Sequence, residues 1–183
     1  MYRLLAGLAL LGLAACSSLN LQTASRLRAL DYINDDIASL VLAFDLPRGL
    51  QPEEGGSVLS FDVATATGGE KHLNAVLVRA DADEIAGTLP PPATNRVYFL
   101  FGFSDKDKTA LREMQSWARA LPADSSGAVK VALAPRFCSI APVDLAKANV
   151  SVLIALPGES SLAPLIDNQK LADALAGSEL GSC

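Results

Sequence analysis

The chain carries residue types used in hydrolysis, but not in the spacing that hydrolysis requires. A serine hydrolase needs a histidine to take the proton of its nucleophile, and His72 is the only histidine in the sequence. It lies beside a Gly-Gly turn, where a solvated side chain is the simpler interpretation. No G-x-S-x-G nucleophile elbow occurs, and Ser160 and Ser161 lack its second glycine. We therefore expect no serine-hydrolase activity.

Metal and phosphate motifs are also incomplete. One histidine, together with two thiols, Cys138 and Cys183, that we expect to pair with each other, leaves no zinc ligand set. The acidic runs at residues 81–84 and 105–107 lack the calcium-loop pattern, and they are better explained as a solvated loop and a helix cap. The glycine pairs at 55–56 and 68–69 are not followed by the Lys-Ser/Thr of a phosphate loop. We expect no enzyme, no metal and no cofactor; carboxylate catalysis would need two acids converging in a cleft.

Cys16 closes an N-terminal segment that has the features of an export signal. Arg3 is its only charge, and residues 4–13 form an apolar run that is too short to span a bilayer, which takes ~20 residues. Leu13-Ala14-Ala15-Cys16 resembles the lipobox of bacterial lipoproteins. The resemblance implies that the chain is cut before Cys16, that its thiol carries a diacylglyceryl group and that its new amine is acylated. The alternatives are a buried helix or a simple secretory signal.

The resemblance predicts where the protein works. Residues 1–15 would be the signal peptide, 16–24 the lipid anchor and tether, and 25–183 a single globular domain. Ser17, rather than aspartate, follows the cysteine, which by resemblance to the enteric sorting rule favours the outer membrane, facing the periplasm. A tether of about eight residues at ~3.4 Å each restricts the domain to roughly 25–30 Å from the bilayer.

The two remaining cysteines form an even pair once Cys16 is lipidated. Disulfides are typical of oxidising compartments, and Cys183 is the last residue, where a bridge would fix a tail that otherwise frays. We therefore predict a Cys138–Cys183 disulfide. The alternatives are a buried Cys138 with a free Cys183, or a reactive thiol, but neither cysteine has a neighbouring basic cluster to lower its pKa.

Composition restricts the class of partner. Half of the residues are apolar, which is enough for a substantial core. Removal of residues 1–15 takes away one arginine and no acid, so the formal charge changes from −5 to −6. An acidic domain without a basic cluster argues against nucleic acid as a partner.

Alternating apolar side chains predict strands over residues 40–46, 57–65, 73–79 and 128–134. Two further segments, 97–103 and 150–156, are apolar on both faces, which is typical of central strands. A helix follows Ser104, with Asp107 completing a cap, and carries an apolar stripe to Leu121. Residues 165–176 resemble a closing helix.

These elements predict a mainly β fold, an immunoglobulin-like β-sandwich with one inserted helix and a C-terminal helix. The only tryptophan, Trp117, lies on the inserted helix rather than between two cysteines. The alternative is an α+β fold, with a single mixed sheet covered by helices.

Two hypotheses of function follow. The first is a non-catalytic interaction or assembly component of the bacterial envelope, held on the membrane by its lipid and binding another envelope protein by a surface or strand edge. The second is a lipoprotein that binds a small hydrophobic ligand between sheet and helix. It would use a cavity of ~300–1,000 Å³ beside Phe99, Phe101 and Trp117, although these aromatic residues are also what a core needs.

Overall fold

The computed structural model describes residues 18–66, 69–122, 127–175 and 180–183. The expected signal peptide, Cys16, and Thr67 and Gly68 of the hairpin turn lie outside this range. Within the described residues, no helix is long and apolar enough to cross a membrane.

Six strands were correctly predicted to within a few residues of their ends, four from period-2 patterning and two from runs that are apolar on both faces. They are β1 (Val41–Pro47), β3 (Val58–Thr65), β4 (Glu70–Arg79), β5 (Arg96–Phe103), β6 (Gly127–Ala134) and β8 (Asn149–Ala155). With β9 (Ala163–Lys170) they form one antiparallel sheet in the order β6-β3-β4-β5-β1-β8-β9. The doubly apolar strand β5 is at its centre, as expected.

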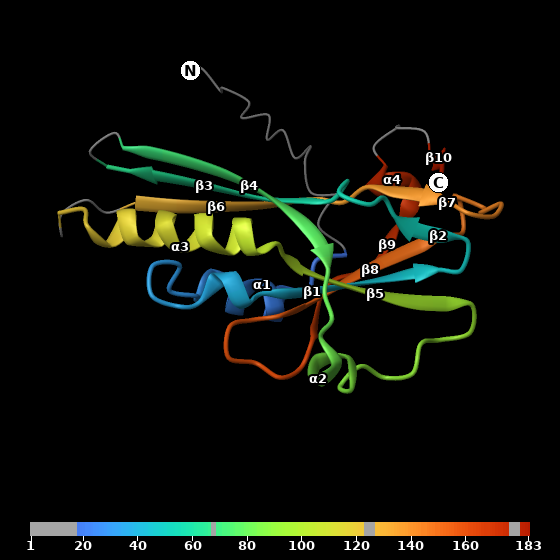
Figure 1. Ribbon diagram of the computed structural model, residues 1–183. Helices are drawn as coiled ribbons and strands as arrows, with labels where there is room; N and C mark the ends of the chain where they lie inside the picture. The colour runs from blue at the N-terminus through green and yellow to red at the C-terminus, as the bar shows by residue number, and fades with distance from the viewer. Residues whose placement is uncertain (1–17, 67–68, 123–126, 176–179) are drawn as a thin grey trace, which may run out of the picture.

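The mainly β fold is confirmed, but the immunoglobulin-like sandwich is not. The reason lies in β4, which pairs through residues 70–76 with β3 and through residues 77–79 with β5. One continuous sheet therefore curls at β4 instead of dividing in two. Figure 1 shows β3, β6 and the first part of β4 above α3, with β1, β5 and β8 crossing at the other end.

The inserted helix is present as α3 (Asp105–Arg119), and it begins as its sequence predicts. The Ser104 side chain accepts a hydrogen bond from the Asp107 backbone N–H at 3.1 Å, and its hydroxyl donates to the Asp107 carboxylate at 2.8 Å. Leu111 and Met114 are buried on its apolar face, and the helix packs against β4, β5 and the short helix η1 (Ile37–Ser39).

The expected C-terminal helix is wrong for most of its length. Residues 163–170 form β9 on the outer side of β8, and only α4 (Leu171–Ala174) is helical. The isolated segment fits a helix, but β8 has backbone groups that need partners, and β9 supplies them. Pairing with β8 therefore outweighs the local preference of this segment for a helix.

Residues 18–24, which we assigned to the tether, belong to the folded domain. Leu19 forms a β-bridge with Ile166, and the Asn20 amide donates to the Leu165 carbonyl at 2.9 Å. Asn20 then caps α1 (Leu21–Arg28). Little extended chain therefore separates position 16 from the domain.

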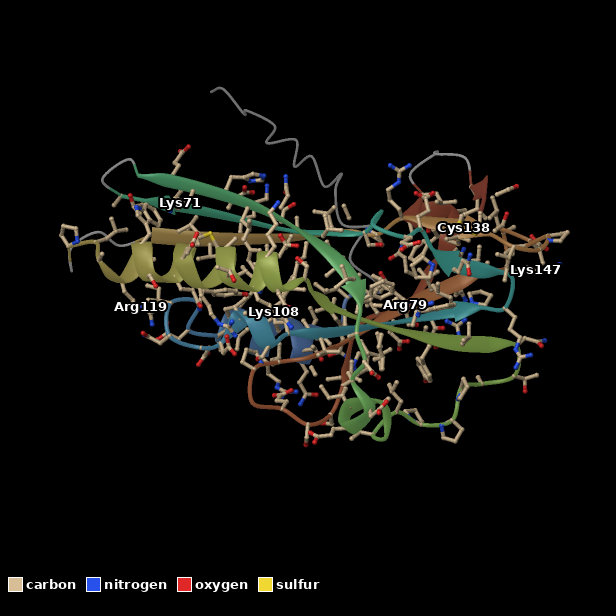
Figure 2. All side chains as sticks on the ribbon, in the orientation of Figure 1. Lys71, Arg79, Lys108, Arg119, Cys138 and Lys147 are labelled. Carbon is tan, nitrogen blue, oxygen red and sulfur yellow. A yellow bond between two sulfur atoms is a disulfide. The ribbon has the colours of Figure 1, made fainter. Side chains whose placement is uncertain are left out.

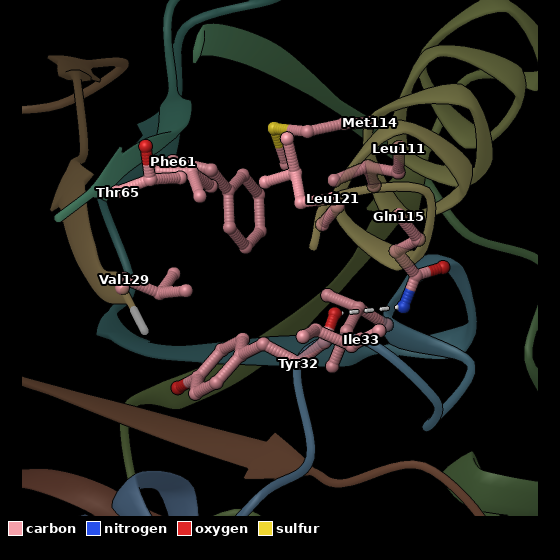
Figure 3. A pocket seen from close by; sticks show the side chains of 13 residues that line it. Tyr32, Ile33, Phe61, Thr65, Leu111, Met114, Gln115, Leu121 and Val129 are labelled. Atoms are coloured by element: carbon pink, nitrogen blue, oxygen red, sulfur yellow. Dashed lines mark hydrogen bonds between the residues drawn. The ribbon is translucent and has the colours of Figure 1, made fainter. Parts of the chain in front are cut away.

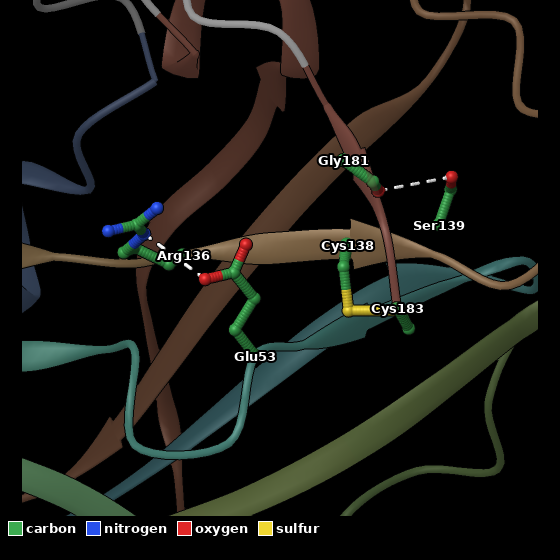
Figure 4. Close-up of a disulfide and its surroundings, with 6 residues drawn as sticks. All are labelled: Glu53, Arg136, Cys138, Ser139, Gly181 and Cys183. Carbon is green, nitrogen blue, oxygen red and sulfur yellow. Dashed lines mark hydrogen bonds and ion pairs between the residues drawn. A yellow bond between two sulfur atoms is a disulfide. The ribbon is translucent and has the colours of Figure 1, made fainter.

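A second, three-stranded sheet lies at one end of the molecule and brings together three segments that are far apart in the sequence (Figure 1). Its order is β10-β7-β2, made of β2 (Leu50–Pro52), β7 (Phe137–Ser139) and β10 (Gly181–Ser182). The predicted disulfide is confirmed here: Cys138 and Cys183 are bridged, with an S–S distance of 2.10 Å (Figure 4). The remaining helix, α2 (Asp83–Ala86), follows β4.

The core is deepest under β1. Phe44 has no exposed surface, and its ring lies 5.3 Å from that of Phe101 and 5.7 Å from that of Phe137. Phe44 thus joins the central strand β5 to the small sheet.

Candidate binding crevice at the edge of the sheet

An apolar crevice opens beneath β3 and β6, next to the end of the main sheet (Figure 3). The sheet supplies Phe61 and Val63 of β3 and Val129 of β6, and α3 supplies the opposite wall. Alternate strand residues point to the same face, so the period-2 pattern that predicted these strands also creates the wall. The cavity volume is about 100 Å³.

The third wall is the loop at residues 31–36, and two polar side chains hold it in place. Gln115 of α3 is 7% exposed, and its Nε2 donates to the carbonyls of Tyr32 at 3.0 Å and Asp35 at 2.7 Å. The Asp31 carboxylate accepts from the Ile33 amide at 3.1 Å and also bonds the Asn34 side chain, which lowers the pKa of Asp31. The loop is thereby fixed against the helix.

The loop presents Tyr32 and Ile33 to the crevice. Ile33 is 39% exposed and lies on the open side of the crevice. The Tyr32 hydroxyl donates to the Leu27 carbonyl at 2.9 Å, and burial raises the pKa of Tyr32 because the phenolate would lose its hydration. The crevice thus offers apolar surface and no reactive group.

The opposite, solvent-facing side of these strands carries polar residues. Asp62 stands between Lys130 on β6 and His72 on β4 in the strand register, and His72 Nδ1 hydrogen-bonds its carboxylate. The nearby Ser60 hydroxyl donates to the Asn74 side-chain oxygen at 2.6 Å. His72 is therefore on an exposed, flat face, and Ser60 is engaged elsewhere.

The structure does not bring together the aromatic residues proposed to line a ligand cavity. Trp117 lies under Lys71, 5.3 Å from its Nζ, whereas Arg79 covers Phe99 and Phe101 at 4.4 and 5.4 Å. Figure 2 shows Lys71 and Arg79 toward opposite ends of β4. Eight residues of extended strand separate them, which corresponds to roughly 25 Å along the chain.

Phe101 borders a different, open cleft of about 880 Å³, together with Glu53, Glu54, Arg79 and the Cys138–Cys183 bridge. The Arg79 guanidinium forms no hydrogen bond or ion pair with another described residue, and burial lowers its pKa. Glu53 is paired with Arg136 at 3.2 Å (Figure 4). The acidic Glu54 makes this cleft a poor site for an anion.

Metal binding has no structural basis in the part of the chain that the structure describes, where no three His, Cys, Asp or Glu side chains gather at metal-binding distance. The acidic residues of the 105–107 run instead lie in the first turn of α3, whose N-cap is Ser104.

Sequence reasoning missed the crevice and the part played by Gln115, Tyr32 and Ile33. One signal was available: Gln115 falls on the apolar face of α3, at helical spacing from Leu111 and Ala118. A buried polar residue must find partners, and here these are the carbonyls of the loop.

No protein-family model matches this chain, and neither a curated protein nor a solved structure does.

Proposed function

We propose that this chain is a lipid-anchored periplasmic domain that acts as a non-catalytic interaction or assembly component of the bacterial cell envelope. The observation that carries the proposal is the β6 end of the sheet, where a regular strand edge, unpaired among the described residues, lies next to an apolar crevice. Such an arrangement suits protein binding, because main-chain hydrogen bonds supply affinity and a recess beside them supplies specificity.

The location rests on the N-terminal motif. Leu13-Ala14-Ala15-Cys16 would attach the domain through its lipid, and Ser17 favours the outer membrane. The Cys138–Cys183 bridge supports an oxidising compartment such as the periplasm. Because residues 18–24 pack on the domain, the domain would lie closer to the bilayer than the 25–30 Å expected from a free tether.

The alternative, binding of a small hydrophobic ligand between sheet and helix, has one supporting feature. The crevice does lie between β3, β6 and α3. Its volume of about 100 Å³ is well below the ~300–1,000 Å³ of ligand pockets, and an apolar cavity of ~150 Å³ accommodates benzene. The space fits a side chain better than a lipid.

Position-specific photocrosslinking in intact cells tests the proposal. A photoreactive residue at Ile33, on the exposed lip of the crevice, is expected to give an adduct with another envelope protein. The same residue at Glu84 of α2, remote from the crevice, is the matched control. Labelled fatty acid should enter the wild type and not Cys16→Ala.

Two results would contradict the proposal. Recovery of the monomer alone from every labelled position at native abundance would remove the interaction function. Absence of labelled fatty acid from the wild type would remove the lipid anchor.

A further inference from the structure

The outer edge of β6 has no strand beside it among the described residues. β6 is the last strand of the main sheet and pairs with β3 alone. The pairing is regular over all eight residues, from Gly127 to Ala134, with no register shift. Proteins protect such an edge with a lysine, a proline, a bulge or a covering segment. β6 carries one of these, Lys130, and has no proline, no bulge and no covering segment among the described residues.

The strand register shows which backbone groups of β6 face outward. The Leu77 amide donates to the Ser57 carbonyl and the Thr65 amide to the Gly69 carbonyl, both at 2.9 Å. Odd-numbered residues of β3 therefore bond β4, and hydrogen-bonded pairs alternate along antiparallel strands. Even-numbered residues of β3 must then bond β6, and their partners on β6 are also even-numbered.

The odd-numbered residues Val129, Val131 and Leu133 consequently direct their N–H and C=O groups to the free edge. Their side chains lie on the crevice face of the sheet, since Val129 lines the crevice and Val131 and Leu133 pack against the core. A strand added at this edge would extend the crevice wall, and every second side chain would point to the crevice side.

Charge restricts what that added strand can be. Lys130 is the only charged residue of β6, and it stands on the exposed face with Asp62 on one side and the free edge on the other. An acidic residue opposite Lys130 would be favoured there, and a basic one disfavoured. The loop on the other side of the crevice also carries two acidic residues, Asp31 and Asp35. Their carboxylates accept hydrogen bonds from backbone amides of the same loop.

The same lysine disfavours pairing with a second copy of this chain in the most symmetric register. Residues 128–132, Ala-Val-Lys-Val-Ala, read the same in both directions, so two β6 edges would match about a two-fold axis at Lys130. That register places two ammonium groups directly opposite each other.

We propose that β6 and the crevice receive an extended segment of another protein, which adds a strand to the sheet. Its apolar side chains alternate toward the crevice, and it carries an acidic residue opposite Lys130. This inference rests on the proposed function and names the partner's chemistry.

The test uses the folded chain without residues 1–15 and with Cys16→Ser, and a synthetic eight-residue probe matching β6 in length. In the probe, valine alternates with threonine, and one central threonine is replaced by glutamate. Amide hydrogen exchange is followed by NMR. Without probe, Lys130 and Ala132 should be protected while Val129 and Val131 exchange freely; with probe, the exchange of Val129 and Val131 should slow at least tenfold.

Val131→Pro removes one outward N–H and should weaken probe binding at least tenfold. Val131→Ala is the matched control, because it loses the side chain but keeps the N–H. Equal affinity of the two variants would overturn the inference, as would chemical-shift changes confined to surfaces away from β6.

Reversing the charge at Lys130 tests whether the added strand carries an acidic residue opposite it. Lys130→Glu should weaken the glutamate probe about threefold or more and favour a probe with lysine at that position; an unchanged preference would overturn the acidic assignment. A probe-free dimer that Val131→Pro dissociates would make the occupant a second copy and also overturn it. If crosslinks to an envelope protein arise from other surfaces while β6 binds no probe, this inference fails and the proposed function stands.

Discussion

The two edges of the main sheet are built in opposite ways. At β9, Leu19 forms a bridge to Ile166, the Asp167 amide donates to the Ser18 carbonyl at 2.7 Å, and the pairing with β8 has two register shifts. β9 also contains Pro164, and Asn168 adopts a left-handed φ of 50°. At β6, by contrast, eight regular residues carry a single charge.

Among the described residues, the β9 edge is therefore closed by irregular pairing, a proline and a covering segment, whereas the β6 edge has only Lys130. Irregular pairing, proline and a covering segment are all ways to prevent strand addition. An open edge carries a risk of aggregation, so the contrast supports a use for β6. Substitutions on the two sides of the sheet test this contrast, and the largest losses in the free energy of unfolding are expected on the β1 side.

The first variant is Phe44→Ala. Phe44 is fully buried between Phe101 and Phe137, so we expect a loss of about 3–5 kcal/mol in the free energy of unfolding. Val129→Ala, at the half-buried crevice wall, should cost about 1 kcal/mol or less. Urea denaturation measures both values. Equal losses would mean that the two halves of the sheet are equally packed.

The second change removes the covalent bridge. Cys138→Ser with Cys183→Ser should lower the free energy of unfolding by roughly 3–4 kcal/mol, because the bridge joins residues 45 apart in the sequence. Urea denaturation of the wild type under reducing conditions is the control and should give the same value. Free thiols in denatured, unreduced Cys16→Ala protein would contradict the bridge.

The third comparison is between neighbouring positions on β6. Ala132→Pro removes an N–H that faces β3, opposite Ser60, whereas Val131→Pro removes one that faces the free edge. We expect Ala132→Pro to cost about 1–3 kcal/mol more, because it leaves a sheet carbonyl without its donor. Thermal unfolding followed by circular dichroism measures the difference. If Val131→Pro were the more destabilising substitution, the even-numbered residues of β6, rather than the odd-numbered ones, would face the free edge.

The smallest effect concerns Tyr32, in the loop at residues 31–36 that forms the third wall of the crevice. Tyr32→Phe removes the hydrogen bond to the Leu27 carbonyl and should cost about 0.5–1.5 kcal/mol at neutral pH. The pKa of Tyr32 is raised by burial from the ordinary value of 10.0, so the unfolded chain ionises first as the pH rises.

The stability contributed by neutral Tyr32 is therefore complete below pH 10 and is lost above it. The difference between wild type and Tyr32→Phe should narrow as the pH rises past 10, when unfolding is measured in urea across the alkaline range. A gap that widens there would contradict the burial of this side chain.

Local patterns predicted much of the secondary structure. The alternation in residues 57–65 and 128–134 and the cap at Ser104 were sufficient, because burial of every second side chain and satisfaction of a helix end are short-range requirements. The cysteine count predicted the Cys138–Cys183 pair. The crevice was not predicted, because its walls come from segments about 100 residues apart.

What the sequence alone determined is that six segments become strands, which faces four of them bury, and that β6 has no proline within its length. Only the tertiary structure decided that residues 163–170 form a strand, that β4 bends the sheet, and that β6 rather than β9 is left at an open edge. The physical reason is that strand pairing is non-local: a backbone edge is satisfied by whatever segment the rest of the fold brings beside it.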